Sequence, residues 1–177
     1  MRILHIDETF HPAFGYQCNP LAKFQKMQGH EVIILTVEKK YIYPVYKAFG
    51  ETGEHLDEQD RDYQEKTGVE IIRIPAKGYI ANRLNYDKKA LYSAVEKINP
   101  DVILSHCFET LTSIRIFFKF RKKYPIVFDS HMLGMASTNK YAKIYEAIFK
   151  RVITPRVVKD NIPVILTQDD DYVNSHL

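Results

Sequence analysis

The chain has 177 residues, of which 45% are hydrophobic and 27% are charged. This length corresponds to about one domain with its own core, and 12% aromatic residues with nearly balanced charges exclude a mostly disordered chain. A net charge of +3 gives no argument for nucleic-acid binding, and two cysteines are too few for a disulfide scaffold. Because the chain shows neither a long apolar run nor a signal-peptide pattern, the sequence predicts a cytoplasmic protein.

Six short segments rich in Val, Ile, Leu and Phe are spread along the chain. Most are continuously apolar rather than alternating, which is typical of strands buried on both faces of a parallel sheet. These segments are residues 3–6, 31–36, 69–74, 101–105, 125–128 and 163–167. They predict a mostly parallel sheet of six or seven strands.

Helical patterns lie between most of these strands. Asn19 and Pro20 are expected to start the first helix, with Asn19 as its cap, and Gly29 is expected to end it. Further helices are predicted at residues 86–98, 109–122, 139–152 and 169–177. Residues 37–68 show no clear element, and such a long loop within a domain is usually functional or mobile. The alternation predicts one doubly wound α/β domain.

Polar residues follow the predicted strands, at the edge where open α/β sheets bind their ligands. They include His11, His106 and His131. Asp129 stands close to His131 and could orient its ring, which can donate at one nitrogen and accept at the other. That chemistry suits a sugar hydroxyl or a reacting proton, whereas a loop histidine bonded to nearby backbone explains His131 equally well.

Other features of this edge are weaker. His106 and Cys107 are adjacent, but no further ligands lie at metal-like spacing, so no metal site is predicted. Gly15 precedes a helix and could let a phosphate approach backbone amides, although the chain has neither a G-x-G-x-x-G motif nor a P-loop. The absence of a nucleophile-elbow pattern argues against a hydrolase of that kind.

Two basic stretches are candidates for a surface function. We interpret the first, residues 119–123, as the solvated outer face of a helix. The second flanks Ile144 and Ile148 and fits either docking on an anionic membrane or a solvated helix face. Its cations are Lys140, Lys143, Lys150, Arg151, Arg156 and Lys159.

Several motifs, taken in order, resemble the N-terminal domain of retaining GT-B glycosyltransferases of family four, the group 1 transferases. They are residues 1–6 (MRILHI), 11–15 (HPAFG), 29–32 (GHEV), 68–75 (GVEIIRIP), 100–106 (PDVILSH), 125–131 (PIVFDSH) and 164–167 (VILT). Each motif alone is loose, whereas their order and spacing over the whole chain are specific.

This resemblance implies that residues 1–177 form a Rossmann-like, acceptor-side domain. The enzyme would move a sugar from a nucleotide-sugar donor to a hydroxyl of a glycan or lipid-linked acceptor, in surface polysaccharide or glycolipid synthesis. His131 would be the catalytic residue beside the transferred sugar, and Gly15 would lie by the donor phosphates. The expected substrate-binding residues also include Tyr16, His106, Glu109 and Asp129. No metal and no cofactor besides the nucleotide-sugar co-substrate is implied.

The resemblance also bears on the surface of the protein, since many members contact membranes through basic helices. It therefore favours peripheral membrane contact through Lys140, Lys143, Lys150 and Arg151.

Two departures from the family pattern matter. Tyr16 stands where the family commonly has a second glycine, and its side chain would crowd a phosphate at the backbone. The nucleotide-binding second domain, with its paired glutamates, has no counterpart here, so we expect this chain alone to be inactive. The alternatives are a stand-alone binding or regulatory module without catalysis, and half of a nucleotide-sugar epimerase.

Overall fold

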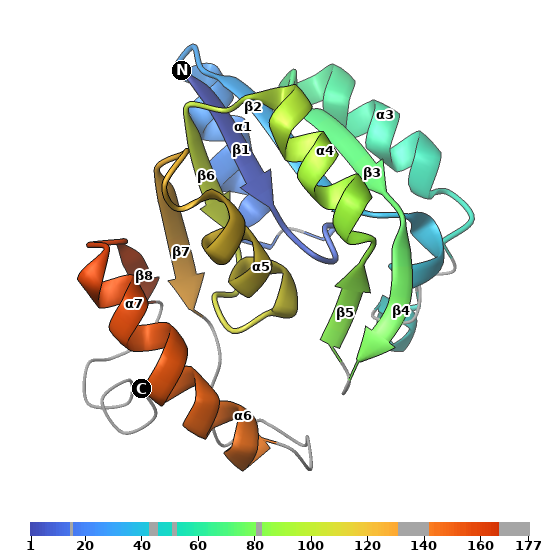
Figure 1. Ribbon diagram of the computed structural model, residues 1–177. Helices are drawn as coiled ribbons and strands as arrows, with labels where there is room; N and C mark the ends of the chain where they lie inside the picture. The colour runs from blue at the N-terminus through green and yellow to red at the C-terminus, as the bar shows by residue number, and fades with distance from the viewer. Residues whose placement is uncertain (15, 43–45, 51–52, 81–82, 131–141, 167–177) are drawn as a thin grey trace.

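A six-stranded sheet forms the centre of the computed structural model, which describes residues 1–14, 16–42, 46–50, 53–80, 83–130 and 142–166 (Figure 1). Every neighbouring pair of strands is parallel. Across the sheet the strands are β3 (Glu70–Ile74), β2 (Glu31–Val37), β1 (Arg2–Ile6), β6 (Val102–Ser105), β7 (Ile126–Ser130) and β8 (Val164–Leu166). The predicted α/β class and the six predicted strands are confirmed.

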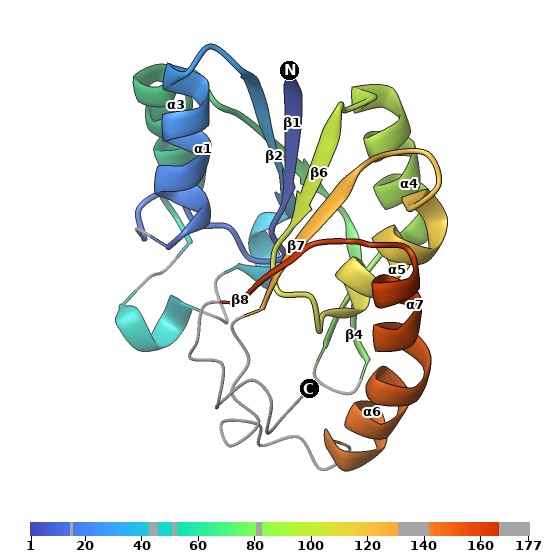
Figure 2. The same ribbon diagram turned by 90° about the vertical axis from the view of Figure 1, so that its left-hand side faces the viewer.

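Helices cover both faces of this sheet (Figure 2). One face carries α1 (Cys18–Met27) and α3 (Leu56–Thr67). The other carries α4 (Lys88–Ile98), α5 (Leu111–Phe120), α6 (Ala142–Ile148) and α7 (Thr154–Lys159). Strands β1 and β2 are therefore enclosed on both sides, which explains why their sequences are continuously apolar.

The core lies in two layers, one on each face of the sheet. The larger layer contains five buried phenylalanines, among them Phe117, Phe120 and Phe128 on the α4–α5 side. The smaller one includes Phe10 and Ala22, under α1. Full burial of such side chains is worth about 1.5–3 kcal/mol each, so the two layers provide the main driving force for folding.

The order in which strands are added to the sheet reverses between β1 and β6, although the strands remain parallel. From β1 the chain builds outward through β2 to β3, and it then returns to add β6, β7 and β8 on the other side of β1. The carboxyl ends of β1 and β6 therefore lie at the switch point of the sheet, the place where open α/β sheets bind ligands.

A small antiparallel hairpin, absent from the sequence prediction, follows β3. It consists of β4 (Ala76–Ile80) and β5 (Arg83–Tyr86), and its register shifts at Gly78, whose φ is +105°. Arg115 of α5 ties β5 down by donating to Asn85 Oδ1 at 2.7 Å. The hairpin lies beyond the carboxyl edge of the sheet (Figure 1), so its residues can reach the site.

The expectation that residues 37–68 hold no clear element is wrong. The second half of that segment is α3, and two short 3-10 helices, Lys39–Tyr41 and Lys47–Phe49, lie in the first half. Leu56 is the one buried residue of α3, so its sequence lacks the apolar stripe by which helices are recognised.

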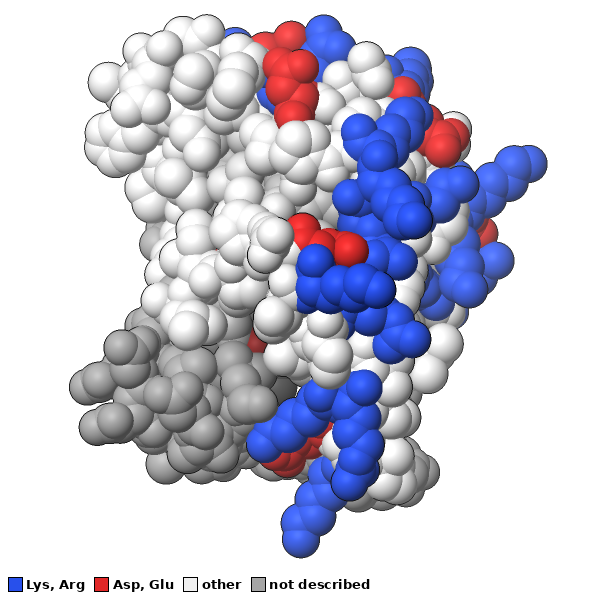
Figure 3. Space-filling view, turned by 60° about the vertical axis from the view of Figure 1, so that its left-hand side comes forward, with Lys and Arg blue, Asp and Glu red and all other residues white. Residues whose placement is uncertain are grey.

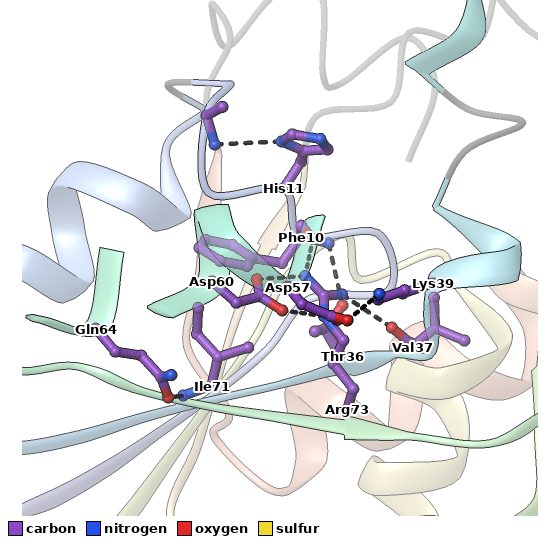
Figure 4. A network of polar contacts seen from close by, with 11 residues as sticks. Phe10, His11, Thr36, Val37, Lys39, Asp57, Asp60, Gln64, Ile71 and Arg73 are labelled. Atoms are coloured by element: carbon purple, nitrogen blue, oxygen red, sulfur yellow. Dashed lines mark hydrogen bonds and ion pairs between the residues drawn. The ribbon is translucent and has the colours of Figure 1, made fainter. Parts of the chain in front are cut away.

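Polar contacts hold α3 in place (Figure 4). The Arg73 guanidinium of β3 donates to both carboxylate oxygens of Asp60, at 2.6 and 2.7 Å, and both side chains are 13% exposed. Gln64 Oε1 accepts the amide of Ile71 at 2.8 Å. A largely buried, bidentate ion pair of this kind fixes orientation as well as distance.

Other helix boundaries also differ from prediction. Asn19 is not a cap: it lies inside α1, and its side-chain amide donates to the carbonyls of His11 and Pro12, both at 3.1 Å. The predicted end at Gly29 is confirmed, because α1 stops at Met27 and Gly29 has a φ of +87°. The helices expected at residues 86–98 and 109–122 are shorter, since Asp87 and Thr110 cap α4 and α5.

The helix predicted at residues 139–152 continues further along the chain than expected. A π-helical turn, Phe149–Ile153, joins α6 to α7, and Pro155 follows it. Proline has no N–H to donate, so the regular backbone hydrogen bonding of the helix is interrupted there, and the wider π-helical turn can form. The expected helix at residues 169–177 lies outside the described residues, as do residues 139–141.

None of the helices in the described part of the chain has both the length and the apolar character needed to span a bilayer.

Candidate functional site

A chain of buried polar contacts lies at the switch point between β1 and β6. His5 Nδ1 is 2.9 Å from His106 Nε2, and His106 Nδ1 is 2.5 Å from Asp129 Oδ2. On the other side, His5 Nε2 is 2.6 Å from Gln25 Oε1 of α1. The strand ends of β1, β6 and β7 are therefore joined through two imidazoles.

One extra proton satisfies every contact in this chain. If His106 is an imidazolium, it donates to Asp129 and to His5, and His5 donates to Gln25. Burial lowers the pKa of His106, but the hydrogen bond to Asp129 and the nearby Asp7 outweigh that effect and raise it. Burial, together with the neighbouring His106, lowers the pKa of His5 to about 4. The pair therefore takes up a first proton more readily than a free histidine does, and it resists a second.

Cys18 brings a third potential metal ligand to the two histidines. Its sulfur and the ring nitrogens of His5 and His106 all lie within 4.8 Å of one another. The two rings are inclined by 11° with centroids 5.2 Å apart, so they meet edge to edge across the 2.9 Å nitrogen contact. Zn–N bonds of about 2.0–2.1 Å at a tetrahedral angle need nitrogens more than ~3 Å apart, with converging lone pairs. The geometry favours a shared proton over a metal.

Asp129 also fixes the loop that follows β6. Its Oδ1 accepts the amide of Cys107 at 2.7 Å, and its carbonyl accepts the amide of Phe108 at 2.7 Å. Cys107 has a φ of 59°, the left-handed region that costs a non-glycine residue about 1–2 kcal/mol. The loop is thus held in a strained shape that presents the next residue, Glu109.

Glu109 is a buried carboxyl group with one oxygen engaged. Ser130 donates to its Oε1, while its Oε2 is buried without a hydrogen-bond partner. Arg83 of the hairpin donates to its main-chain carbonyl at 2.6 Å, and the hydroxyl of Tyr145 donates to the same oxygen. Burial raises the pKa of the Glu109 carboxyl. This group can accept a hydrogen bond from a hydroxyl or hold a proton.

Glu8 is a second, partly buried carboxyl group at the same edge. Its Oε1 accepts the hydroxyl of Thr112 at 2.5 Å and the Thr112 amide at 3.4 Å. Burial raises its pKa as well. Three acids, Glu8, Glu109 and Asp129, thus lie around the ends of β1, β6 and β7.

The structure brings together three of the six predicted site residues. His106, Glu109 and Asp129 lie within one network of contacts around β6 and β7. Tyr16 lies just before α1 and is 56% exposed. Gly15 and His131 lie outside the described residues.

Aromatic rings gather near the ends of β1 and β2. Phe14 stacks on Tyr46 at 4.7 Å between ring centroids, and His11 lies 4.7 Å from Phe14. Phe49 adjoins them and is 71% exposed. These rings form an aromatic cluster beside the carboxyl edge of the sheet. The sequence did not predict this cluster, because its members come from separate loops.

Sequence reasoning also missed His5, Gln25, Arg83 and Tyr145. His5 lies in the middle of a strand, where a histidine among apolar residues is the one signal that could have indicated a polar interior contact. Arg83 and Tyr145 come from a hairpin and a helix face, and nothing in their sequence neighbourhood points to Glu109.

A scan against protein-family models gave no match, and a search of curated proteins gave none either. Solved structures resemble the chain at low sequence identity. MurG of Acinetobacter baumannii is 10% identical, with 96% of this chain and 42% of that chain covered and a TM-score of 0.47. A putative UDP-N-acetylglucosamine 2-epimerase of Listeria monocytogenes is 14% identical over 83% of this chain and 37% of that chain, with a TM-score of 0.45.

The glycosyltransferase SsfS6 of Streptomyces sp. SF2575, solved in complex with thymidine diphosphate, is 15% identical. That match covers 90% of this chain and 45% of that chain, with a TM-score of 0.43. The chain spans less than half the length of each of these three structures.

Proposed function

We propose that the chain is the acceptor-side domain of a GT-B glycosyltransferase that moves a sugar from a nucleotide-sugar donor to an acceptor hydroxyl. The product would belong to surface polysaccharide or glycolipid synthesis. The nucleotide would be bound by a second α/β domain, and residues 1–177 alone would not catalyse transfer. The motif order of the sequence supports this proposal, together with the site at the switch point.

The observation that carries it is the meeting of His106, Asp129 and Glu109 at the switch point. A glycosyl transfer needs groups that orient hydroxyls and control a proton, and no redox centre or covalent nucleophile. Hydrogen-bonded imidazoles with one shared proton, beside a carboxyl group with a free oxygen, meet that need. We propose that Glu109 and His106 line the acceptor site, with His131 and Gly15 nearer the donor.

The first test is to read the gene beyond the codon for Leu177. We expect a second α/β domain with paired glutamates near its end. The protein with both domains should transfer a labelled sugar from a panel of nucleotide sugars, and the 177-residue chain should not. Transfer by the short chain would contradict the proposed division of labour, and isomerisation of the donor without acceptor would point to an epimerase.

A point variant tests the site itself. Glu109→Gln in the two-domain protein should reduce kcat/KM for the acceptor by at least tenfold while donor binding stays the same. The matched control is Glu54→Gln, an exposed carboxyl group in the turn before α3, which should leave both unchanged. Equal activity of the Glu109 variant would remove this residue from the site.

We further propose that the chain contacts membranes peripherally through α6 and the π-helical turn. Lys143 and Arg151 are exposed there beside Ile144 and Ile148, which are 63% and 52% exposed. Lys150 is partly neutralised by Glu146 at 2.9 Å, and Lys140 lies outside the described residues. An apolar ridge bordered by cations is the pattern of helices that lie in an anionic interface.

Co-sedimentation with vesicles tests this contact. The chain should bind phosphatidylcholine vesicles that contain phosphatidylglycerol and not those without it, and added salt should weaken binding. Lys143→Glu with Arg151→Glu should abolish it. The control, Lys23→Glu with Lys66→Glu, makes the same charge change on α1 and α3, and it should bind as before. Equal binding by both pairs would contradict the proposed surface.

A further inference from the structure

The two sides of β6 and β7 are buried to different degrees. On the α4–α5 side, Ile103 of β6 and Ile126 and Phe128 of β7 are buried in the core. The residues that alternate with them, Leu104 and Val127, are only partly buried. Leu104 and Val127 are register partners, so their side chains point to the same side of the sheet. One side of these two strands is therefore closed, and the other is open.

The open side is the side that carries α1. Leu104 pairs in the register with His5, whose ring contacts α1. One strand further out, Ile165 of β8 pairs with Asp129, two residues after Val127, and Ile165 is 52% exposed. An apolar strip therefore crosses β6, β7 and β8 on this side. We call Leu104, Val127 and Ile165 the open strip.

The helices on this side stop short of the open strip. In the part of the chain that the structure describes, α1 packs on β2 and α3 packs on β3 (Figure 2). Under these helices Ile3, Val32 and Ile34 are buried, so the cover ends near β1. Because a helix with its side chains is about 10 Å across, the edge of this layer forms a step beside the open strip.

The sequence of β6 and β7 does not match an open side. A strand with one side in water normally alternates apolar and polar residues, whereas residues 102–104 and 126–128 are apolar at every position. Such a run is typical of strands that are covered on both sides. A further layer is therefore expected over the open strip.

Helix α1 presents an apolar surface of its own. Phe24 and Met27 lie on its outer side and are 57% and 70% exposed, and Leu21 lies beside Phe24. Lys26 is on another flank, because its side chain reaches Gly68 at the end of α3. The flank of α1 away from α3 is therefore apolar. We call Leu21, Phe24 and Met27 the α1 stripe.

The α1 stripe and the open strip are complementary between two copies of the chain. A two-fold axis along the step lays α1 of each copy over the open strip of the other. Each copy then supplies the helix layer that the other lacks, and the heights match because the same helix forms both steps. A contact of this kind uses the same surface on both copies, so it closes after two subunits.

The charge distribution favours this side for a contact between copies. Figure 3 shows Lys and Arg side chains gathered in a band along one side of the molecule, whereas the opposite side of the view carries few charged side chains. Two copies with a net charge of +3 each repel one another where their basic bands meet. The residues of the strip and the stripe are uncharged, so a second copy can approach there.

We propose that the open strip and the α1 stripe form the interface of a two-fold symmetric dimer of this chain. The proposal is independent of the glycosyltransferase function, since it uses neither the switch point nor α6.

The dimensions of the interface indicate a weak dimer. Strands about 4.8 Å apart beside a helix of ten residues give a contact of roughly 15 by 20 Å on each copy. This is smaller than the ~800 Å² per partner of a standard interface. We therefore expect a dissociation constant in the range of roughly 10–100 μM.

Sedimentation equilibrium of the 177-residue chain tests the dimer, over two decades of concentration around that value. Wild type should pass from monomer to dimer. Phe24→Glu places a carboxylate in the apolar contact and should weaken dimerisation by about tenfold or more. The matched control is Ile148→Glu on α6, since Ile148 is 52% exposed and lies outside the interface. Circular dichroism checks that both variants are folded.

A charge pair tests the crosswise arrangement. Ile165→Lys, in the open strip, should weaken dimerisation as Phe24→Glu does. An equimolar mixture of the two variants should dimerise more strongly than either variant alone, because the new carboxylate of one copy meets the new ammonium group of the other. A mixture no stronger than the single variants would overturn this arrangement.

The remaining outcomes are equally decisive. A monomer at every concentration would overturn the dimer, and equal weakening by Phe24→Glu and Ile148→Glu would overturn the proposed surface. The two-domain protein should dimerise as the 177-residue chain does. If it stays monomeric while the shorter chain dimerises, the second domain covers the open strip, and a second copy is not its natural partner.

Discussion

Two buried polar networks hold the ends of the strands, and they differ in the chemistry of their charges. Under α3, the Arg73 guanidinium grips Asp60. At the switch point, two hydrogen-bonded imidazoles face Asp129, which His106 contacts directly. An arginine keeps its proton at every pH at which proteins fold, whereas a histidine changes its charge between about pH 5 and 8.

This difference separates a structural network from a functional one. The Arg73–Asp60 pair can only attach α3 to β3. The His5–His106–Asp129 chain can attach β1, β6 and β7 to one another and can also take up or release a proton. A buried charge is therefore informative about function when the group that bears it can titrate.

The largest expected effect comes from breaking the arginine pair. Asp60→Ala leaves the Arg73 guanidinium largely buried without its carboxylate, and should lower the free energy of unfolding by about 3–4 kcal/mol. Chemical denaturation at pH 6 and pH 9 should give the same loss, because the guanidinium keeps its charge. The double variant Asp60→Ala with Arg73→Met should recover part of the loss; a loss as large as that of the single variant would contradict the account.

The next largest effect belongs to His5 and depends on pH. Its folded pKa of about 4 lies below the ordinary histidine pKa of 6.5, so the unfolded chain binds a proton that the folded chain does not bind. Stability is lost as the pH falls from 6.5 to 4, on the order of 3 kcal/mol from this group. Urea unfolding of the wild type and of His5→Asn measures it.

Comparing the wild type with His5→Asn separates the contribution of His5 from those of other titrating groups. Glu8 and Glu109, whose pKa values burial raises, oppose the loss by binding a proton in the folded state, but they do so in both chains. The variant should show a flatter dependence over this window, and an unchanged slope would show that His5 does not resist protonation.

Asp129→Asn should have a smaller effect with the opposite pH trend. The raised pKa of His106 stabilises the fold fully below the unfolded pKa, and this stability is lost as the pH rises through the folded pKa. Removing the carboxylate should therefore lower stability by about 2 kcal/mol near pH 5.5, and by less near pH 9. A loss that does not vary with pH would make this network resemble the arginine pair.

The smallest effect concerns the cap of α5, which holds the Glu109 loop without any charge. Thr110 Oγ1 accepts the amide of Ser113 at 3.1 Å. Thr110→Ala should lower stability by about 1 kcal/mol at every pH, and Thr110→Ser should restore most of it. Thermal unfolding of the three chains provides the measurement, and a pH-dependent loss would indicate that the cap and the histidine network are coupled.

The strands were predictable because their residues are apolar on both faces of the sheet. Residues 32–35 and 102–104, for example, are continuously apolar, and this pattern needs no knowledge of the partner strands. In contrast, α3 was not predictable, because Asp60 and Gln64 hold it through polar contacts that its own sequence does not reveal.

The candidate site was predictable only in part. The ends of β6 and β7 identified His106, Glu109 and Asp129, since the fold rule specifies that edge. His5 was not identified, because its partner His106 is 101 residues away in the sequence. Arg83 and Tyr145 were missed for the same reason, as their contact with Glu109 exists only in three dimensions.

The π-helical turn that ends at Ile153 sets the length of the exposed ridge. From Ile144 to Val152 the ridge is about 12 Å long, and the extra residue in the turn then rotates the following helix away from that line. Three partly exposed aliphatic side chains contribute roughly 5 kcal/mol on transfer from water, which corresponds to a dissociation constant on the order of 0.1 mM. Attachment of that strength is brief, so each molecule would visit many patches of lipid in turn instead of residing on one.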